Sequence, residues 1–325
     1  MNKRRRDLVA LAACFTIPRA AIAQKQVVSI PRVGFLSVSS PHAYELSTRV
    51  EAMRAGLRDL GYIEGKTIEI DYKYAGGQYE RLPELAAELV RTKVKLIVAP
   101  GSAARAAAAV TTSIPIVTVN WTYPVDNYRA INLAHPEGNI TGLAQFDLTP
   151  KHLEWLRAIF PAGLHVALLR NSLAYSTATQ AIAEGAAKSL GIRYTYFEMR
   201  EPQGLAQVFQ QMSKQRIDAV HTRTEATITE NANVIAALAL THKLPLIGSV
   251  PIAEAGGLIG YSVNGREMYR RVSYFVDKIL RGASPKNLPM ELPSKFDVVI
   301  NMRTAKALAI KIPNSIIVQA TKVIE

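Results

Sequence analysis

The chain has 325 residues, of which 49% are hydrophobic, and a formal net charge of +13. This length can bury two hydrophobic cores, so we expect two domains. The basic residues form no stripe interleaved with aromatic residues, which argues against a nucleic-acid partner. The one cysteine, Cys14, lies in a segment that we expect to be removed. Disulfides, thiol catalysis and thiolate metal sites are therefore excluded from the mature chain.

Residues 1–23 are typical of an export signal. The basic start "MNKRRRD" precedes the apolar stretch "LVALAACFTI", and Ala21-Ile22-Ala23 forms a small-residue cleavage site before Gln24. The apolar stretch is about half as long as a membrane span. Cleavage there removes five basic residues and one acidic residue, which lowers the net charge from +13 to +9. We therefore expect the mature protein in the periplasm.

Two features of this leader leave the export route open. Arg5-Arg6 is compatible with a twin-arginine address, although a plain secretory signal fits as well. "LAAC", ending at Cys14, has the look of a lipoprotein cleavage box. Cleavage at that box would leave a protein anchored by lipid through Cys14.

Beyond the leader, strand and helix patterns alternate in chain order. The expected strands and helices of the first half are 32–38, 44–60, 68–75, 81–92, 95–100, 102–110 and 114–121. After a Gly- and Pro-containing crossing at 130–146 the alternation resumes, with expected elements at 165–171, 176–191, 192–199, 205–215, 217–223, 227–243 and 244–249. Further passages follow at 256–265 and 287–301. The fold class is therefore α/β, with two doubly wound parallel-sheet lobes joined by a multi-crossing hinge.

We assign 32–145 plus 258–288 to the first lobe and 146–257 plus 289–325 to the second lobe. Ligands of open parallel sheets collect beyond the carboxyl ends of the strands, so the cleft between the lobes is the expected binding site. The candidate ligand-binding residues follow strand ends or lie in the second crossing: Ser39, Ser40, Gly101, Ser102, Ala103, Asn120, Trp121, Tyr123, Asn171, Ser172, Tyr175, Thr224, Glu225 and Tyr261. Hydroxyls and helix-start N–H groups suit a carboxylate, and the aromatic residues suit an apolar body.

No reaction centre emerges from the motifs. Ser102 lacks a nucleophile elbow, because the residue two positions later is Ala104, and the histidines have no metal-ligand spacing. No phosphate loop or dinucleotide fingerprint is present either. We expect Ser102 to cap the helix that follows it and to bind the ligand. The sequence thus predicts a binding protein without catalytic residues, metal or cofactor.

These stretches together resemble the periplasmic substrate-binding proteins of ABC transporters, in the group with tryptophan- and tyrosine-type binders. The resemblance covers nearly all of 33–325, and its main carriers are residues 56–90, 94–117, 132–143, 255–264 and 274–316. It implies a type I periplasmic binding fold, a monomer that delivers a small ligand to an inner-membrane permease. It also implies that Gly101-Ser102-Ala103-Ala104 is the loop that holds the ligand carboxylate. A sensor that feeds a receptor, or an enzyme on the same scaffold, are the alternatives.

Two departures from the family pattern bear on the ligand. Tyr123 stands where relatives usually have an aspartate, and Thr224-Glu225 stand where an Asp or Asn is common. A buried ammonium group needs a carboxylate partner, and Glu225 is the one candidate near the cleft. We therefore expect a small carboxylate with an aromatic or apolar body, and place an aromatic acid ahead of an aromatic or branched amino acid.

Overall fold

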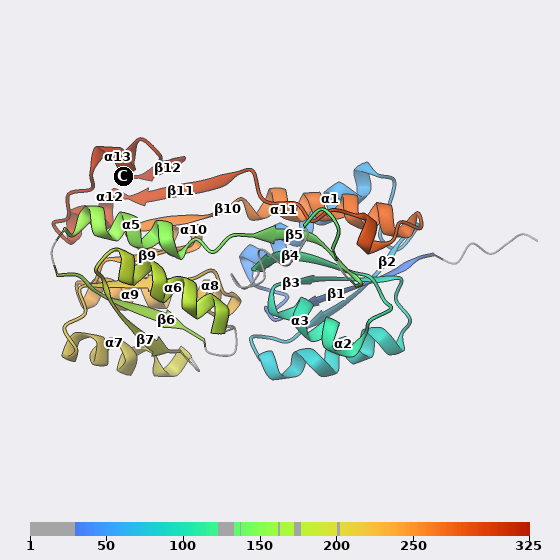
Figure 1. Cartoon of the computed structure of the whole chain (residues 1–325), viewed down its shortest axis with the longest axis horizontal. Coiled ribbons are helices and arrows are strands. Elements are labelled where there is room, and N and C mark those ends of the chain that lie inside the picture. The colour runs from blue at the N-terminus through green and yellow to red at the C-terminus, as the bar shows by residue number, and fades with distance from the viewer. Residues whose placement is uncertain (1–29, 123–132, 137, 162, 172–176, 200–201) are drawn as a thin grey trace, which may run out of the picture.

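The computed structural model describes residues 30–122, 133–136, 138–161, 163–171, 177–199 and 202–325. They form two α/β lobes that lie side by side (Figure 1). The chain passes between the lobes three times: after β5, after β10 and before β11. Two separate sheets and a three-crossing connection confirm the fold class expected from the alternating pattern.

The first lobe contains a five-stranded parallel sheet in the order β2-β1-β3-β4-β5. Its strands are β1 (Arg32–Ser37), β2 (Glu69–Tyr74), β3 (Leu96–Pro100), β4 (Ile116–Thr122) and β5 (Ile140–Gln145). Its helices are α1 (Tyr44–Asp59), α2 (Leu82–Arg91), α3 (Ser102–Val110), α11 (Gly265–Leu280) and the short 3-10 turns η1 (Tyr79–Arg81) and η4 (Pro285–Asn287). One core cluster lies between the sheet and α1 with α11, and the other between the sheet and α2 with α3.

The second lobe contains a seven-stranded sheet in the order β12-β11-β10-β9-β8-β6-β7. Its strands are β6 (His165–Arg170), β7 (Arg193–Glu198), β8 (Ala219–Thr222), β9 (Leu246–Gly248), β10 (Ile259–Val263), β11 (Phe296–Asn301) and β12 (Lys322–Ile324). Its helices are α5 (Thr149–Ile159), α6 (Thr177–Ser189), α7 (Leu205–Lys214), α8 (Ala226–Glu230), α9 (Ala232–Thr241), α10 (Val250–Glu254), α12 (Met302–Ala307), α13 (Asn314–Ile317) and the 3-10 turn η3 (Pro202–Gly204). Apolar clusters fill both faces of this sheet.

The structure differs from the sequence-based boundaries in several places. We expected 258–288 in the first lobe, but β10 pairs with β9 and β11 of the second sheet. The crossing therefore falls after β10, and α11 with η4 returns to the first lobe. The chain stays there as far as Glu291, which pairs with Leu143 of β5, although we expected the second lobe from residue 289. The helix expected over 227–243 is two helices, because Asn231 interrupts it and its side-chain amide donates to the Thr227 carbonyl.

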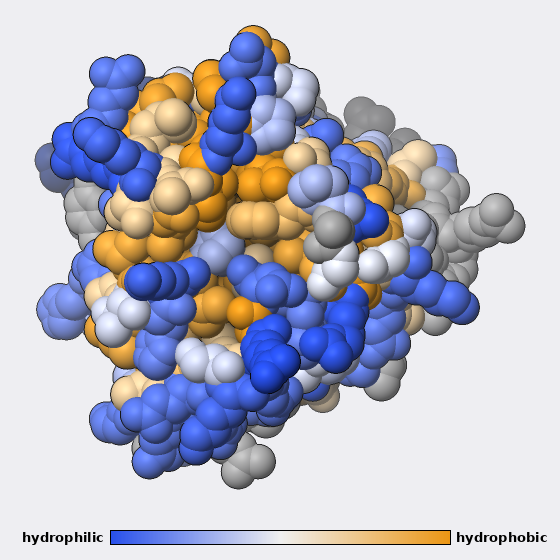
Figure 2. Space-filling model, turned by 90° about the vertical axis from the view of Figure 1, so that its left-hand side faces the viewer, coloured by the Kyte–Doolittle hydropathy of each residue, from blue (hydrophilic) through white to orange (hydrophobic). Residues whose placement is uncertain are grey.

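The far end of the second lobe presents apolar side chains framed by hydrophilic ones (Figure 2). Val318, just after α13, is the most exposed large hydrophobic side chain among the described residues, at 80%. Within the described part of the chain, no helix combines the length and apolar character that crossing a membrane requires. Each lobe buries its own hydrophobic core, and the expected ligand-binding site lies between the lobes.

Candidate functional site

The candidate site lies where strands of the two sheets end toward the other lobe. In the first lobe, the loops after β1 and β3 occupy this edge, and in the second lobe those after β6 and β8 do. Figure 1 places α8, the first helix after β8, at the boundary between the lobes. Several of the described contacts across this boundary join α8 to the turns that face it.

The loop after β3 turns sharply into α3. Gly101 has φ of 49°, in the left-handed region that glycine adopts at low cost, and its N–H donates to the Val119 carbonyl at 2.9 Å. Gly101 occupies the N-cap position, and Ser102 is the first residue of the helix. The expectation that Ser102 caps α3 is therefore wrong. The Ser102 hydroxyl is left for another role, and Ala103 behind it is fully buried.

The loop after β8 brings a carboxylate into the wall of the second lobe. Glu225 is 8% exposed and takes the N-cap position of α8, with extended backbone. Its Oε2 accepts the backbone N–H of Asn171 at 3.1 Å, which joins the loops after β6 and β8. Thr224 beside it is exposed. A buried carboxylate at this position can pair with a cationic group of a ligand.

A set of contacts joins α8 to the first lobe. Glu230 Oε1 accepts the backbone N–H of Ser40 at 3.1 Å, and the Ser39 hydroxyl also hydrogen-bonds this carboxylate. Ala226 packs against the first-lobe core cluster that contains Tyr79 and Ala103. Ser39 and Ser40, both predicted as ligand donors, therefore contact the other lobe in this structure.

Two carboxylates, Glu225 and Glu230, and one guanidinium, Arg105, lie near Tyr79 at this junction. Partial burial raises the pKa of Glu230, and the hydrogen bonds from Ser39 and Ser40 oppose that rise. Burial, reinforced by the nearby charge of Glu225, raises the pKa of Tyr79. In the described residues, no three His, Cys, Asp or Glu side chains gather as metal ligands would. The junction is therefore suited to a cationic group, with helix-start N–H groups of α3 available for an anionic one.

The other predicted residues fall into three groups. Tyr261 lies in β10 and packs with Trp155 and Phe296, at ring-centroid distances of 5.2 Å and 5.5 Å, on the core of the second lobe. The structure thus gives Tyr261 a packing role. Asn120 and Trp121 belong to β4, which runs on to Thr122 instead of ending before them. The predicted residues outside the described part of the chain are Tyr123, Ser172 and Tyr175.

Sequence reasoning missed Tyr79 at the junction, and it placed Glu230 beside a possible cleft loop but interpreted it as a solvated carboxylate. Tyr79 is 8% exposed and follows Gly76-Gly77 at the end of β2, so the rule about strand ends applied to β2 would have found it. Glu230 carries no such signal. It lies one helical turn beyond Glu225, and only the packing of the lobes brings it against Ser40.

Comparison with known proteins places this geometry in a family. A family model described as "ABC transporter substrate binding protein" matches residues 37–324. A curated relative, the tyrosine-binding protein of Clostridioides difficile strain R20291, is 25% identical over 258 residues, 78% of this chain and 74% of its own.

Solved structures share the fold. A conserved domain protein of Vibrio cholerae has a TM-score of 0.82 and 23% identity, with 90% of this chain and 99% of that chain covered. A domain from Streptococcus pneumoniae in complex with L-Trp has a TM-score of 0.81 and 23% identity, with 91% and 100% covered. The ligand-free, open structure of a Clostridium difficile substrate-binding protein has a TM-score of 0.62 and 21% identity, with 91% and 99% covered. The fold is that of type I periplasmic binding proteins, and the chain belongs to the substrate-binding protein family of ABC transporters.

Proposed function

We propose that this protein is the exported solute-binding component of an ABC importer and captures an aromatic α-amino acid between its two lobes. The observation that carries the ligand class is Glu225, a carboxylate that is 8% exposed at the end of β8. The start of α3, at Ser102 and Ala103, would hold the ligand carboxylate through its N–H groups. Glu225 would pair with the ligand ammonium group.

This proposal reverses the order of ligands favoured by the sequence. The sequence placed an aromatic acid first, because Tyr123 stands where relatives usually have an aspartate that could pair with an ammonium group. In the structure, Glu225 is buried at the N-cap of α8 and tied to Asn171. Burial of a carboxylate costs free energy that a cationic partner recovers. The L-Trp complex and the tyrosine-binding relative support the same ligand class.

The test compares each amino acid with its deaminated form. L-tryptophan and indole-3-propionate, then L-tyrosine and 3-(4-hydroxyphenyl)propionate, are titrated by calorimetry against wild type, Glu225→Gln and Ser102→Ala. We expect wild type to prefer the amino acids. Glu225→Gln keeps the acceptor for Asn171 and should weaken amino-acid binding about 30-fold or more, since truncating one side of a buried charge pair costs about 2–5 kcal/mol.

The control and the contrary result are equally specific. Glu154→Gln changes an exposed acid on α5, paired with Lys151, and should leave both affinities unchanged. Indole-3-propionate binding should survive Glu225→Gln but weaken in Ser102→Ala. Equal or tighter wild-type binding of the deaminated acids, unaffected by Glu225→Gln, would return the aromatic acid to first place.

Delivery to a permease, and the absence of catalysis, are parts of the same proposal. The family supports a membrane permease as the partner, and we place the mature protein in the periplasm as a monomer. Neighbouring permease and ATPase genes would support import, and a receptor gene in their place would support sensing. Recovery of chemically altered ligand after incubation with purified protein would show an enzyme instead.

A further inference from the structure

The helix α8 makes contacts in two directions. At its first end, Glu225 faces its own lobe and hydrogen-bonds the Asn171 N–H. At its last residue, Glu230 faces the other lobe and accepts the Ser40 N–H, 190 residues away in sequence. One short helix therefore carries both the carboxylate proposed for the ligand and a carboxylate that joins the lobes.

The remaining described contacts of α8 strengthen this junction. Ala226 packs on the first-lobe cluster around Tyr79, and a methyl group of Thr227 lies 3.9 Å from the position a Cβ would take on Gly77. Ala226 and Glu230 are four residues apart, so they share one face of the helix. That face is turned to the first lobe.

The donors of the junction, Ser39 and Ser40, are held in place by contacts within the first lobe. The backbone of the loop after β1 is fixed by the Ser39 N–H donating to the Ser37 hydroxyl at 3.2 Å. The Gly77 N–H donates to the Val38 carbonyl, and this ties the turn after β2 to the same loop. The Ser39 hydroxyl and Ser40 N–H thus converge on Glu230 from one preorganised loop.

We propose that Glu230 is a closure residue, which holds the lobes together through Ser39 and Ser40 and so sets ligand affinity without touching the ligand. The predicted effect of Glu230 on ligand affinity rests on the proposed function, whereas its predicted effect on lobe separation does not depend on the identity of the ligand. A binding protein whose binding-competent form is the closed one loses apparent affinity in proportion to the population of that form. Glu230 stabilises the closed form, so its loss should speed ligand release more than it slows capture.

The chemistry of the contact distinguishes two substitutions. Glu230→Ala removes the acceptor. Glu230→Gln keeps a carbonyl acceptor for the Ser40 N–H and the Ser39 hydroxyl while removing a charge that partial burial disfavours, as the raised pKa of Glu230 indicates. Closure should therefore be lost in Glu230→Ala and retained in Glu230→Gln, whereas a simple charge effect would disturb both.

The lobe separation can be measured without any ligand. Spin labels at Glu84→Cys on α2 and Gln210→Cys on α7, both exposed, report the distance between the lobes by electron double resonance. The labelled protein starts at Gln24 and therefore lacks Cys14, the other cysteine of the sequence. Glu230→Ala should shift the distances to longer values, Ser39→Ala should do so less, and Glu230→Gln and the surface control Glu154→Ala should match the parent.

The second arm measures L-tryptophan binding by calorimetry and stopped flow. We expect Glu230→Ala to raise Kd about fivefold, mainly through the dissociation rate, because an exposed charge-assisted contact contributes about 1 kcal/mol. Unchanged distances in Glu230→Ala, with and without L-tryptophan, would overturn the proposal. Weaker binding with unchanged distances would overturn it as well, since Glu230 would then act on the ligand directly. If wild type binds no L-tryptophan, the proposed ligand fails, and the distances still decide the role of Glu230.

Discussion

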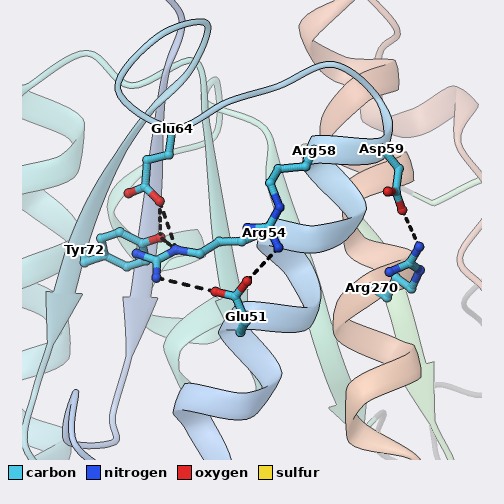
Figure 3. A network of polar contacts seen from close by, with 7 residues as sticks. All are labelled: Glu51, Arg54, Arg58, Asp59, Glu64, Tyr72 and Arg270. Atoms are coloured by element: carbon cyan, nitrogen blue, oxygen red, sulfur yellow. Dashed lines mark hydrogen bonds and ion pairs between the residues drawn. The ribbon is translucent and has the colours of Figure 1, made fainter.

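The two lobes share an architecture but differ in their histidines, which are exposed in the described part of the first lobe and mostly buried in the second. The first lobe arranges charges along the surface of α1 and α11, where Arg54 contacts Glu64 and Tyr72, Arg58 contacts Glu51, and Arg270 contacts Asp59 (Figure 3). In the second lobe His152, His165 and His221 are buried, and His152 and His221 contact each other in the core. Stability should therefore respond to salt weakly in the first lobe and to acid strongly in the second.

Tyr194, His221 and His152 form a directed chain of hydrogen bonds in the second lobe. His152 Nε2 lies 3.0 Å from the Tyr261 carbonyl, which can only accept, so this nitrogen carries a proton. In the neutral ring His152 Nδ1 then accepts from His221 Nε2, at 3.0 Å. His221 Nδ1 in turn accepts from the Tyr194 hydroxyl at 2.6 Å. Each imidazole ring therefore carries its one proton on Nε2, and a second proton on Nδ1 of either ring would break a hydrogen bond.

The largest effect is expected on cutting this chain. His221→Leu should lower the free energy of unfolding by about 4 kcal/mol, because it leaves the Tyr194 hydroxyl and His152 Nδ1 buried without partners, at about 1–3 kcal/mol each, and changes the packing. Urea unfolding measures the loss. The matched control is His242→Leu, at a half-buried histidine on the surface that contacts Ser213, which should cost less than about 1 kcal/mol. Equal losses in the two variants would contradict the distinction between the lobes.

Acid should produce the next largest effect. Burial lowers the pKa of His152 to about 4 and that of His221 well below its usual value. The unfolded chain therefore binds more protons than the folded one once the pH falls below about 6.5, and stability is lost as the pH falls. His152 alone should account for about 3 kcal/mol between pH 7 and pH 4.

Two measurements check this pH dependence. Urea unfolding across pH 7 to 4 gives the slope, and nitrogen chemical shifts of the imidazoles report protonation directly. Both rings should remain neutral at pH 5 in the folded protein. An imidazolium signal from His152 or His221 at pH 5 would refute the directed chain of hydrogen bonds.

Features that depend on residues close together in the chain were predictable from the sequence, and contacts between distant residues were not. The alternation of apolar strands and helices predicted both sheets and most element bounds, because that periodicity is local. The Pro-Gly-Ser sequence around Gly101 predicted the turn before α3. The predicted N-cap was Ser102, whereas Gly101 occupies that position in the structure. The pairing of His152 with His221 and the contact of Ser40 with Glu230 join residues 69 and 190 positions apart, and no local pattern encodes them. Tyr261, predicted as a ligand contact because it lies near a crossing, packs on Trp155 in this structure, and its contact with a ligand stays a prediction.

In the first lobe, Tyr72→Phe should have a smaller effect than the histidine variants. The Tyr72 hydroxyl accepts from Arg54 Nε at 2.9 Å and lies 3.3 Å from Glu64 Oε2. Arg54 keeps its ion pair with Glu64 when the hydroxyl is removed, so about 1 kcal/mol should be lost. Tyr74→Phe, whose ring stacks on Tyr72, is the matched control and should change stability little. A loss as large as that of His221→Leu would mean that the first lobe also depends on a polar core.

The smallest effect should come from Arg58 and Glu51 on α1. Their side chains are 53% and 55% exposed and 2.7 Å apart, and Figure 3 shows the contact on the outer surface of the helix. Water screens the attraction, and two long side chains lose rotamer freedom to hold it, so a double-mutant cycle with Arg58→Ala and Glu51→Ala should give a coupling of about 0.5 kcal/mol or less. That coupling should shrink further in 1 M NaCl, where the Debye length is about 3 Å. The histidine chain is neutral and buried, so the cost of His221→Leu should be the same at both salt concentrations. A salt-sensitive cost of His221→Leu, or a coupling between Arg58 and Glu51 that survives salt, would remove the contrast between a screened surface and a shielded core on which these expectations depend.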